Sequence, residues 1–374
     1  MFAEVVVVGA GFSGAVCARR LAESGKNVCV IERLNHIAGH SYDYKNEYGI
    51  TVHKYGPHIF HTNEKSVWDF IKPFSDFHHY QHRVLSYAEG NLYEFPINLD
   101  TINQVFGTHL NINEVEDFLK TEIKKYPVDP TDENFETAVI SQVGEHLYNL
   151  FFRNYTLKQW EKEPKELSSQ LAKRIPIRKN RDNRYFSDKY QGIPERGYTH
   201  LIKNILNHPN ISVLTNTDYF SVSDSLSPSL TIYTGELDRY FDYKYGKLEY
   251  RSLELEFKNY DREFYQNVAT VNYPNDYDWT RITEFKHFLN ESSEQTTVCF
   301  EYPKADGEPY YVVMNDENLK KREKYIKEVE RLEKTGKVFF VGRLAEYKYY
   351  NMDQVILRSL QKTEEWLNHL TNKM

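Results

Sequence analysis

Two histidines three residues apart, His58 and His61, lie in the mostly apolar stretch KYGPHIFHT at residues 54–62, just after a Gly-Pro turn. A pair of imidazoles can bind a metal, satisfy hydrogen bonds inside a core, or face a cofactor. No carboxylate recurs near them at the spacing of metal ligands, so we expect no metal site. The choice between the other two roles depends on what the rest of the chain binds.

The first forty residues contain a pattern typical of dinucleotide binding. Gly9, Gly11 and Gly14 form G-x-G-x-x-G between an apolar run at residues 4–8 and a stretch with the apolar spacing of a helix. Such glycines allow a tight turn, a close approach of the backbone to a pyrophosphate, and close packing of helix on strand. Glu32 ends the next predicted strand, where a carboxylate can accept hydrogen bonds from a ribose. The alternative is a glycine turn in an unrelated α/β domain.

The residues after Glu32 favour FAD over NAD. The run RLNHIAGHSYD at residues 33–43 is similar to the flavoprotein continuation, in which a glycine turn returns the chain towards the pyrophosphate. A late predicted strand at 337–342 ends in glycine before a final helix at 353–370. This order suits an FAD fold that closes over its cofactor with C-terminal chain.

The composition excludes several classes of protein. A formal net charge of −7 argues against nucleic acid as the main partner. Three cysteines without a C-x-x-C pair fit a reducing compartment and no structural zinc. The N-terminal VVVV run is far shorter than the ~20 apolar residues of a membrane span, so we expect a cytoplasmic protein with no span. A chain of 374 residues predicts two or three packed subdomains.

The elements between the two ends change in character along the chain. A helix is expected after a capping box formed by Asn113 and Glu116, and another over about 135–150. Residues 211–313 alternate like strands, and a charged helix follows at 317–335. The ends therefore predict α/β structure, and the middle is first helical and then β.

Several long stretches resemble one family, the bacterial UDP-galactopyranose mutases, and together they cover nearly the whole chain. They are GAGFSGAV (9–16), KYGPHIFHT (54–62), FPINLDTINQ (95–104), YTLKQW (155–160), KRIPIR (173–178), YQGIP (190–194), YFDYKYGKLEYRSL (240–253), TRITE (280–284), EPYY (308–311) and GRLAEYKYYNMDQVI (342–356).

The resemblance implies an FAD enzyme that makes no net redox change and converts UDP-galactopyranose to UDP-galactofuranose. In that family N5 of the reduced flavin attacks the anomeric carbon and expels UDP. The adduct then opens and recloses through O4, and UDP returns. The implied partners are a nucleotide sugar and an external reductant such as NAD(P)H, and a homodimer is expected.

The resemblance also implies roles for individual residues. Catalytic roles are expected for His61, Arg174 and Arg281. The two arginines would bind the diphosphate. The expected cofactor-binding residues are Gly9, Gly11, Phe12, Ser13, Gly14, Glu32, Arg33, Gly39, His40, His58, Ile59, Gly342, Arg343, Met352 and Asp353. The expected substrate-binding residues are His82, Gln104, Phe152, Tyr155, Thr156, Trp160, Tyr185, Arg251, Asn272, Tyr311, Tyr349 and Asn351.

The chain departs from the family pattern near the sugar end of the implied site and at the glycine turn beside FAD. The departures are His82 for asparagine, Glu161 for glycine, Phe285 for histidine, Asn351 for aspartate, and Ala38 and His40 within the turn. Unpaired buried polar groups cost ~1–3 kcal/mol, so such changes can alter sugar preference while the mechanism is kept. dTDP-fucopyranose and UDP-N-acetylgalactosamine are the alternative substrates.

The expected fold is α/β, with a discontinuous Rossmann-like FAD-binding domain, a helical subdomain and an antiparallel β-sheet subdomain. Residues 1–95, 196–235 and 316–374 would form the FAD domain, 96–165 the helical part, and 166–195 with 236–315 the sheet part and its mobile loop. Two other functions stay open: a flavin oxidoreductase that removes hydride, and an inactive protein that binds nucleotide sugars.

Overall fold

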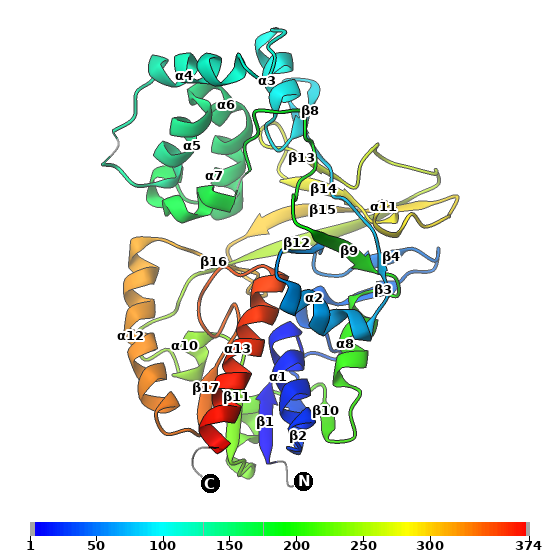
Figure 1. Cartoon of the computed structure of the whole chain (residues 1–374), viewed down its shortest axis with the longest axis vertical. Coiled ribbons are helices and arrows are strands. Elements are labelled where there is room, and N and C mark those ends of the chain that lie inside the picture. The colour runs from blue at the N-terminus through cyan, green and yellow to red at the C-terminus, as the bar shows by residue number, and fades with distance from the viewer. Residues whose placement is uncertain (1–3, 130, 175, 372–374) are drawn as a thin grey trace.

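The structure is a computed structural model that describes residues 4–129, 131–174 and 176–371, with the side chains of 173–174 and 368–371 left outside the described set. Figure 1 shows three regions: a sheet with long helices at the bottom, a second sheet across the middle, and a group of short helices at the top. Both termini lie at the bottom, so the lower region is built from the two ends of the chain.

The lower sheet is parallel, with the strand order β10-β2-β1-β11-β17. Val5 and Val7 of the central strand belong to the core beneath the long helices, whereas Val6 packs with Cys29 and Ile31 on the opposite face. Because both faces are covered at the centre of the sheet, Val5–Val8 and Val28–Ile31 are apolar along their length. The strands are β1 (Val5–Val8), β2 (Val28–Ile31), β10 (Ile211–Leu214), β11 (Leu230–Tyr233) and β17 (Val338–Phe340).

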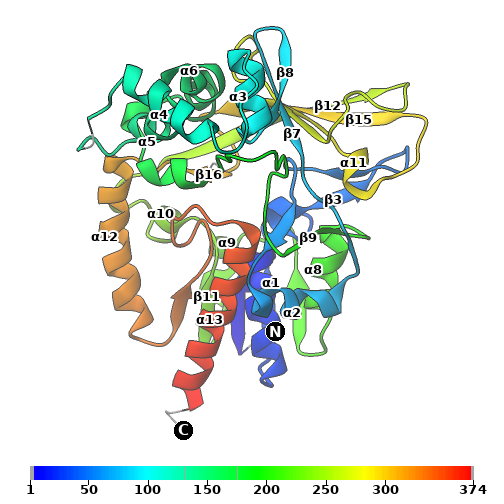
Figure 2. The same cartoon turned by 45° about the horizontal axis from the view of Figure 1, so that its top comes forward.

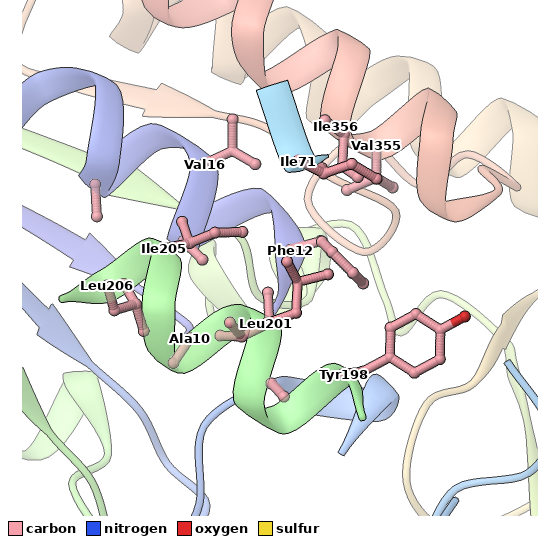
Figure 3. Close-up of a cluster of buried hydrophobic side chains, with 14 of the residues drawn as sticks. Ala10, Phe12, Val16, Ile71, Tyr198, Leu201, Ile205, Leu206, Val355 and Ile356 are labelled. Atoms are coloured by element: carbon pink, nitrogen blue, oxygen red, sulfur yellow. The ribbon is translucent and has the colours of Figure 1, made fainter. Parts of the chain in front are cut away.

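Three helices cover one face of this sheet: α1 (Phe12–Glu23), α8 (Tyr198–Leu206) and α13 (Met352–Thr371). Figure 3 shows Val16 of α1 near Ile205 of α8 and Ile356 of α13, and all three side chains are fully buried. Burying each such side chain contributes ~1.5–3 kcal/mol. This core holds the start of α13 beside the start of α1, although some 340 positions separate them in the sequence.

The second sheet has seven strands in the order β16-β12-β15-β14-β13-β7-β8. Its neighbours are antiparallel except for the parallel pair β13 and β7. It crosses the molecule between the lower and upper regions in both views (Figures 1 and 2). The strands are β7 (Val84–Ala88), β8 (Asn91–Phe95), β12 (Tyr250–Tyr260), β13 (Thr270–Asn272), β14 (Arg281–Glu284), β15 (Thr296–Lys304) and β16 (Tyr311–Val312).

The upper region is helical and has a core of its own, which includes Phe95, Ile102, Val139 and Leu147. Its helices are α3 (Leu99–Phe106), α4 (Val115–Lys125), α5 (Phe135–Val143), α6 (Glu145–Tyr148) and α7 (Asn154–Trp160), with a π-helical turn at Asn149–Arg153 joining the last two.

The helix caps differ from the prediction. The expected capping box of Asn113 and Glu116 is wrong, because α4 begins at Val115 with Glu114 before it. Among the described α-helices, capping boxes form at Asn98 and Asn134, where a threonine three residues later completes each box. Threonine replaces the usual Glu or Gln in both boxes, because its hydroxyl makes the same reciprocal bond.

In the lower and middle regions, two segments pair with other strands than the predicted domain division implies. Residues 84–95, assigned from the sequence to the FAD domain, pair into the seven-stranded sheet through β7 and β13. β9 (Tyr190–Pro194), assigned to the sheet subdomain, pairs with β5 (Phe60–Thr62) and β6 (Phe77–His78) in a small separate sheet. Both differences come from strand pairing across segments far apart in sequence.

The remaining strands and α-helices complete the fold. They are β3 (Asp43–Lys45), β4 (Thr51–His53), α2 (Lys65–Ile71), α9 (Tyr219–Val222), α10 (Leu237–Tyr240), α11 (Lys286–Leu289) and α12 (Asp316–Glu333). Among the helices of the described residues, none combines the length and apolar character that a membrane crossing requires.

Candidate active site

The turn between β1 and α1 leaves no room for a side chain at Gly9, and the first turn of α1 leaves none at Gly14. A Cβ on Gly9, where φ is +100°, would lie 2.2 Å from Thr234 Oγ1, and one on Gly14 would lie 1.9 Å from the Gly9 carbonyl oxygen. Gly11 is the N-cap of α1, and no described side chain caps this helix. The backbone N–H groups of its first turn can therefore bind a pyrophosphate.

A second glycine turn lies against the first. The Ala38 N–H donates to the Ala10 carbonyl at 2.9 Å. A Cβ on Gly39 would lie 3.2 Å from the Gly11 Cα. Ala38, which departs from the family pattern, has φ +76°, a left-handed conformation that costs a non-glycine residue about 1 kcal/mol. The two turns form a cradle lined by backbone, which fits a dinucleotide.

Glu32 is held at the end of β2 by two backbone donors. Its Oε2 accepts from the Ala10 N–H at 2.7 Å, and its Oε1 accepts from the Leu34 N–H at 2.8 Å. The carboxylate is buried and lines the cavity above the glycine turn. Its role as a ribose ligand stays a prediction.

Glu308 is a residue of this region that the sequence reasoning missed. Arg33 Nη2 donates to both of its oxygens, at 2.7 and 2.9 Å, and His40 Nε2 lies 3.4 Å from Oε1. Burial alone would raise the pKa of Glu308, but the hydrogen bonds from His40 and Arg33 outweigh it and lower the pKa to about 2. Glu308 thus links the sheet region to two predicted cofactor residues.

A cavity follows the cradle, and most of the predicted cofactor residues line it. Gly14, Gly342 and Asp353 are not part of its lining, and Ile59 lines the neighbouring cleft instead. Gly342 acts through close packing, since a Cβ there would lie 2.5 Å from Ser13 Oγ. The predicted residues along the cavity are Gly9, Gly11, Phe12, Ser13, Glu32, Arg33, Gly39, His40, His58, Arg343 and Met352.

A second cavity joins the first, since His40, His58, Arg343, Asn351 and Met352 line both. We call this second cavity the cleft. It lies where the three regions of the fold meet, because its lining comes from α7, the seven-stranded sheet and the segment before α13. The other predicted residues that line it are His61, His82, Phe152, Tyr155, Thr156, Trp160, Tyr185, Asn272, Arg281, Tyr311 and Tyr349.

Arg281 is held in the cleft by a carboxylate that the sequence reasoning also missed. It faces Glu301 directly across the β14–β15 pair, with Nε 2.9 Å from Oε2. Burial works against the cation, but Glu301 and nearby tyrosines outweigh it and hold the pKa of Arg281 above its ordinary value. Glu301 is fully buried, and a lone carboxylate in the apolar strand TTVCFEY is the signal that could have found it.

Aromatic rings surround the cationic centre. Tyr311 and Tyr349 stack with centroids 5.7 Å apart and planes at 10°, and Trp160 lies 6.3 Å from each. Tyr155 lines the same cleft, and burial raises its pKa to about 12. Flat faces and hydroxyl groups beside a fixed cation suit a base and a diphosphate.

The two histidines of the 54–62 stretch have different environments. His58 Nδ1 lies 2.9 Å from the Gly56 carbonyl, and burial lowers the pKa of His58 to about 3, so the ring is neutral. His61 is half-buried in β5 and stacks on Phe186, with centroids 3.6 Å apart. Both line the cleft. The structure describes no group of three or more potential metal ligands.

Two predicted substrate residues do not line the cleft. Gln104 donates through Nε2 to the Leu92 carbonyl at 3.2 Å. Arg251 is fully buried, and its Nε donates to the Gln159 carbonyl at 3.0 Å near the end of α7. Its Nη2 lies 2.9 Å from Oε1 of Glu161.

Three further sequence-based expectations concern Phe285, the predicted mobile loop and Arg174. Phe285 is fully buried beside His53 and Phe288, so this position is part of the core. The stretch 173–184, predicted as a mobile loop, is followed by Tyr185, whose N–H donates to the His82 carbonyl at 2.7 Å. The side chain of Arg174 lies outside the described residues, so its role stays a prediction.

Comparison with known proteins agrees with this geometry. A family model described as UDP-galactopyranose mutase matches residues 150–349, and one described as an NAD(P)-binding Rossmann-like domain matches residues 7–74. A probable UDP-galactopyranose mutase of Klebsiella pneumoniae is 39% identical over 376 positions, covering 99% of this chain and 96% of the relative. The chain belongs to the UDP-galactopyranose mutase family.

Members of this family differ in the sugar that they convert. A dTDP-fucopyranose mutase of Escherichia coli is 37% identical over 377 positions, covering 98% of this chain and 99% of the relative. The fold also matches a crystal structure of reduced UDP-galactopyranose mutase with a TM-score of 0.78 at 17% identity, over 98% of this chain and 96% of that chain. The UDP-galactopyranose mutase family is one of isomerases and implies a flavin cofactor and a nucleotide-sugar substrate.

Proposed function

We propose that this protein is an FAD-dependent mutase that interconverts a nucleotide-linked hexopyranose and its furanose form, with UDP-galactopyranose as the first candidate substrate. One observation carries the proposal: a backbone-lined dinucleotide cradle opens directly into a cleft that holds a fixed cation and stacked tyrosines. A hydride-removing oxidase has no need of this diphosphate-binding chemistry beside its cofactor.

The cradle residues would hold FAD along the first cavity. The open end of α1 would bind the pyrophosphate, Glu32 the adenosine ribose, and Arg343 would lie near the flavin, since it lines both cavities. When bound in its reduced form, FAD would supply the nucleophile that displaces the nucleoside diphosphate from the anomeric carbon. The protein supplies position and charge.

Arg281 is the proposed main ligand of the diphosphate. Its guanidinium is fixed by Glu301 in a largely buried setting, where a charged hydrogen bond to phosphate is stronger than in water. Tyr311 and Tyr349 would offer hydroxyl groups, and Tyr155 a face for the base. Arg174 is the proposed second arginine, from the family resemblance.

dTDP-fucopyranose is the second candidate substrate. Two observations favour it: the nearly equal identity to a dTDP-fucopyranose mutase, and His82 in the cleft where the family pattern has asparagine. Burial lowers the pKa of His82 to about 3, so it faces the sugar as a neutral ring.

The test is turnover by the purified protein under anaerobic conditions. The flavin is reduced with dithionite, UDP-galactofuranose is added, and its conversion to UDP-galactopyranose is followed by anion-exchange chromatography. dTDP-fucofuranose and UDP-N-acetylgalactofuranosamine are run in parallel, and oxidised enzyme is the control. Turnover confined to the reduced enzyme is expected.

The outcomes separate the candidate functions. The highest kcat/KM identifies the sugar. If the oxidised flavin is reduced by a substrate, the protein is an oxidoreductase and the proposal fails. Binding of every nucleotide sugar without turnover of any would indicate an inactive nucleotide-sugar-binding protein.

A further inference from the structure

One segment, residues 186–191, makes several contacts with His61. Phe186 covers one face of the ring with planes at 12°, and His61 faces Gln191 across the β5–β9 pair. Asp188 completes the arrangement, with Oδ2 3.0 Å from His61 Nδ1. Asp188 lies 127 positions from His61 in the sequence and was not predicted to have a role.

Asp188 is itself oriented by neighbours. Asn63 Nδ2 donates to its other oxygen, Oδ1, at 2.8 Å, and Gln191 Nε2 donates to its backbone carbonyl at 2.7 Å. Asn63 is held in turn, since its Oδ1 accepts from the Lys189 N–H at 2.9 Å. The carboxylate therefore has a fixed direction towards the ring, and both His61 and Asp188 line the cleft.

A carboxylate accepts hydrogen bonds, so the ring nitrogen that faces Asp188 carries the proton. In a neutral imidazole the other nitrogen, Nε2, is then an acceptor. We infer that Asp188 is a positioning residue that fixes this tautomer of His61 and so makes its Nε2 a proton acceptor in the cleft. A second carboxylate, Asp353, bonds to Thr62, and no described hydrogen bond joins it to His61.

The inference rests on the proposed function and gives His61 a defined task in it. When a pyranose becomes a furanose, the C1–O5 bond breaks and its electron pair stays on O5, which gains a proton. A lone pair of O4 forms the new C1–O4 bond, and O4 loses a proton. Over the whole conversion O5 gains one proton and O4 loses one, so no net acid or base is consumed. His61 acts at ring closure, where its neutral Nε2 takes the O4 proton and releases it to water, and water supplies the proton that O5 gains when the ring opens.

His82, in the same cleft, provides an internal contrast. The Tyr80 hydroxyl lies 3.0 Å from its Nδ1, and among the described residues this is the hydroxyl's one hydrogen-bond partner. Because a phenol donates a hydrogen bond more readily than it accepts one, we expect the hydroxyl to donate and His82 to carry its proton on Nε2. Of these two rings in the cleft, His61 thus presents Nε2 as an acceptor, whereas His82 presents Nε2 as a donor.

Ring tautomers are read directly by nitrogen NMR of the full-length protein labelled with [15N]histidine, at about pH 8, where ordinary histidines are neutral. His61→Gln and His82→Gln variants assign the two rings. We expect the Nδ1–H form for His61 and the Nε2–H form for His82. Asp188→Asn should shift His61 towards the Nε2–H form and leave His82 unchanged, whereas Asp69→Asn, an exposed aspartate on α2, should change neither.

Kinetics of the reduced enzyme form the second readout. Asp188→Asn should lower kcat about 10- to 100-fold, as loss of acid–base catalysis does, with KM changed less than about threefold. Asp188→Glu should restore part of kcat. An unchanged His61 tautomer in Asp188→Asn would overturn the inference, and so would full kcat with a changed tautomer. Wild-type enzyme that converts no nucleotide sugar would overturn the proposed function, and the tautomer would still decide whether Asp188 positions the ring.

Discussion

The cradle and the cleft are built in different ways. The cradle is made mostly of backbone from residues 9–14 and 32–40, and its shape depends on glycines whose Cβ atoms would collide with neighbouring chain. The cleft is made of side chains from every region of the fold, and its charged groups are paired across strands or segments. The shape of the cradle therefore depends on steric exclusion, whereas the arrangement of charged groups in the cleft depends on the electrostatics of buried pairs.

Gly14→Ala should have the largest effect and should act on the cradle. The new Cβ would lie 1.9 Å from the Gly9 carbonyl oxygen, so α1 must move away from β1. Overpacking of this kind costs ~1–3 kcal/mol or more, and we expect loss of bound FAD. FAD absorbance after gel filtration and the Tm check this. Gly25→Ala is the control and should keep FAD, since nothing lies within 4 Å of its Cβ and its φ of +90° adds only left-handed strain of ~1–2 kcal/mol.

Arg281→Ala should act on the cleft and spare the cradle. Removing the guanidinium leaves Glu301 as an unpaired buried charge, which costs ~3–5 kcal/mol. Urea unfolding measures the loss. Arg281→Ala combined with Glu301→Gln should regain most of that stability, keep FAD, and still bind the nucleotide sugar weakly. Full substrate affinity in the double variant would contradict the assignment of Arg281 as the diphosphate ligand.

Acid should destabilise both regions through three buried histidines. Burial lowers the pKa values of His53, His58 and His82 from 6.5 to about 3. Between these pH values the unfolded chain binds more protons than the folded one, so stability is complete above pH 6.5 and falls as the pH drops towards 3. Between pH 7.5 and 5.5 each histidine should account for ~1.4 kcal/mol of lost stability.

Substitution of His82 divides this acid effect between the two regions. His82→Gln, in the cleft, should remove about one third of the loss between pH 7.5 and 5.5, measured by urea unfolding at each pH. His53 and His58, beside the cofactor region, should account for the rest. A pH dependence unchanged by His82→Gln would show that this ring is not buried and neutral as described.

Glu161→Gly should have the smallest effect. Glycine removes a left-handed strain of about 1 kcal/mol at φ +48°. The variant also loses a pair with Arg251 that is worth ~0–1 kcal/mol, because Glu161 is more than half exposed. Stability should therefore change by less than about 1 kcal/mol, with no change in KM. A KM change above threefold would show that Arg251 reaches the substrate after all.

Prediction from sequence succeeded best where structure is local. The G-x-G-x-x-G turn, the strands around it and Glu32 were all predicted, because steric rules between residues close in the chain allow few conformations. The same rules failed at Asn113, where several polar residues compete to precede one helix and the start is decided by packing. Local patterns select an element more reliably than its first residue.

The parallel cofactor region was predictable from the amino-acid sequence alone, and family resemblance added many side chains of the cleft, among them Arg281, Tyr311 and Tyr349. The partners of two cleft residues became visible only in the folded chain: Glu301 for Arg281 and Asp188 for His61. The same is true of Glu161, which pairs with Arg251 outside the cleft. Residues 84–95, predicted to belong to the FAD domain, likewise pair into the seven-stranded sheet. These partners could not be predicted because strand register and subdomain packing bring them together. The number of residues between two groups in the chain does not give their distance in space.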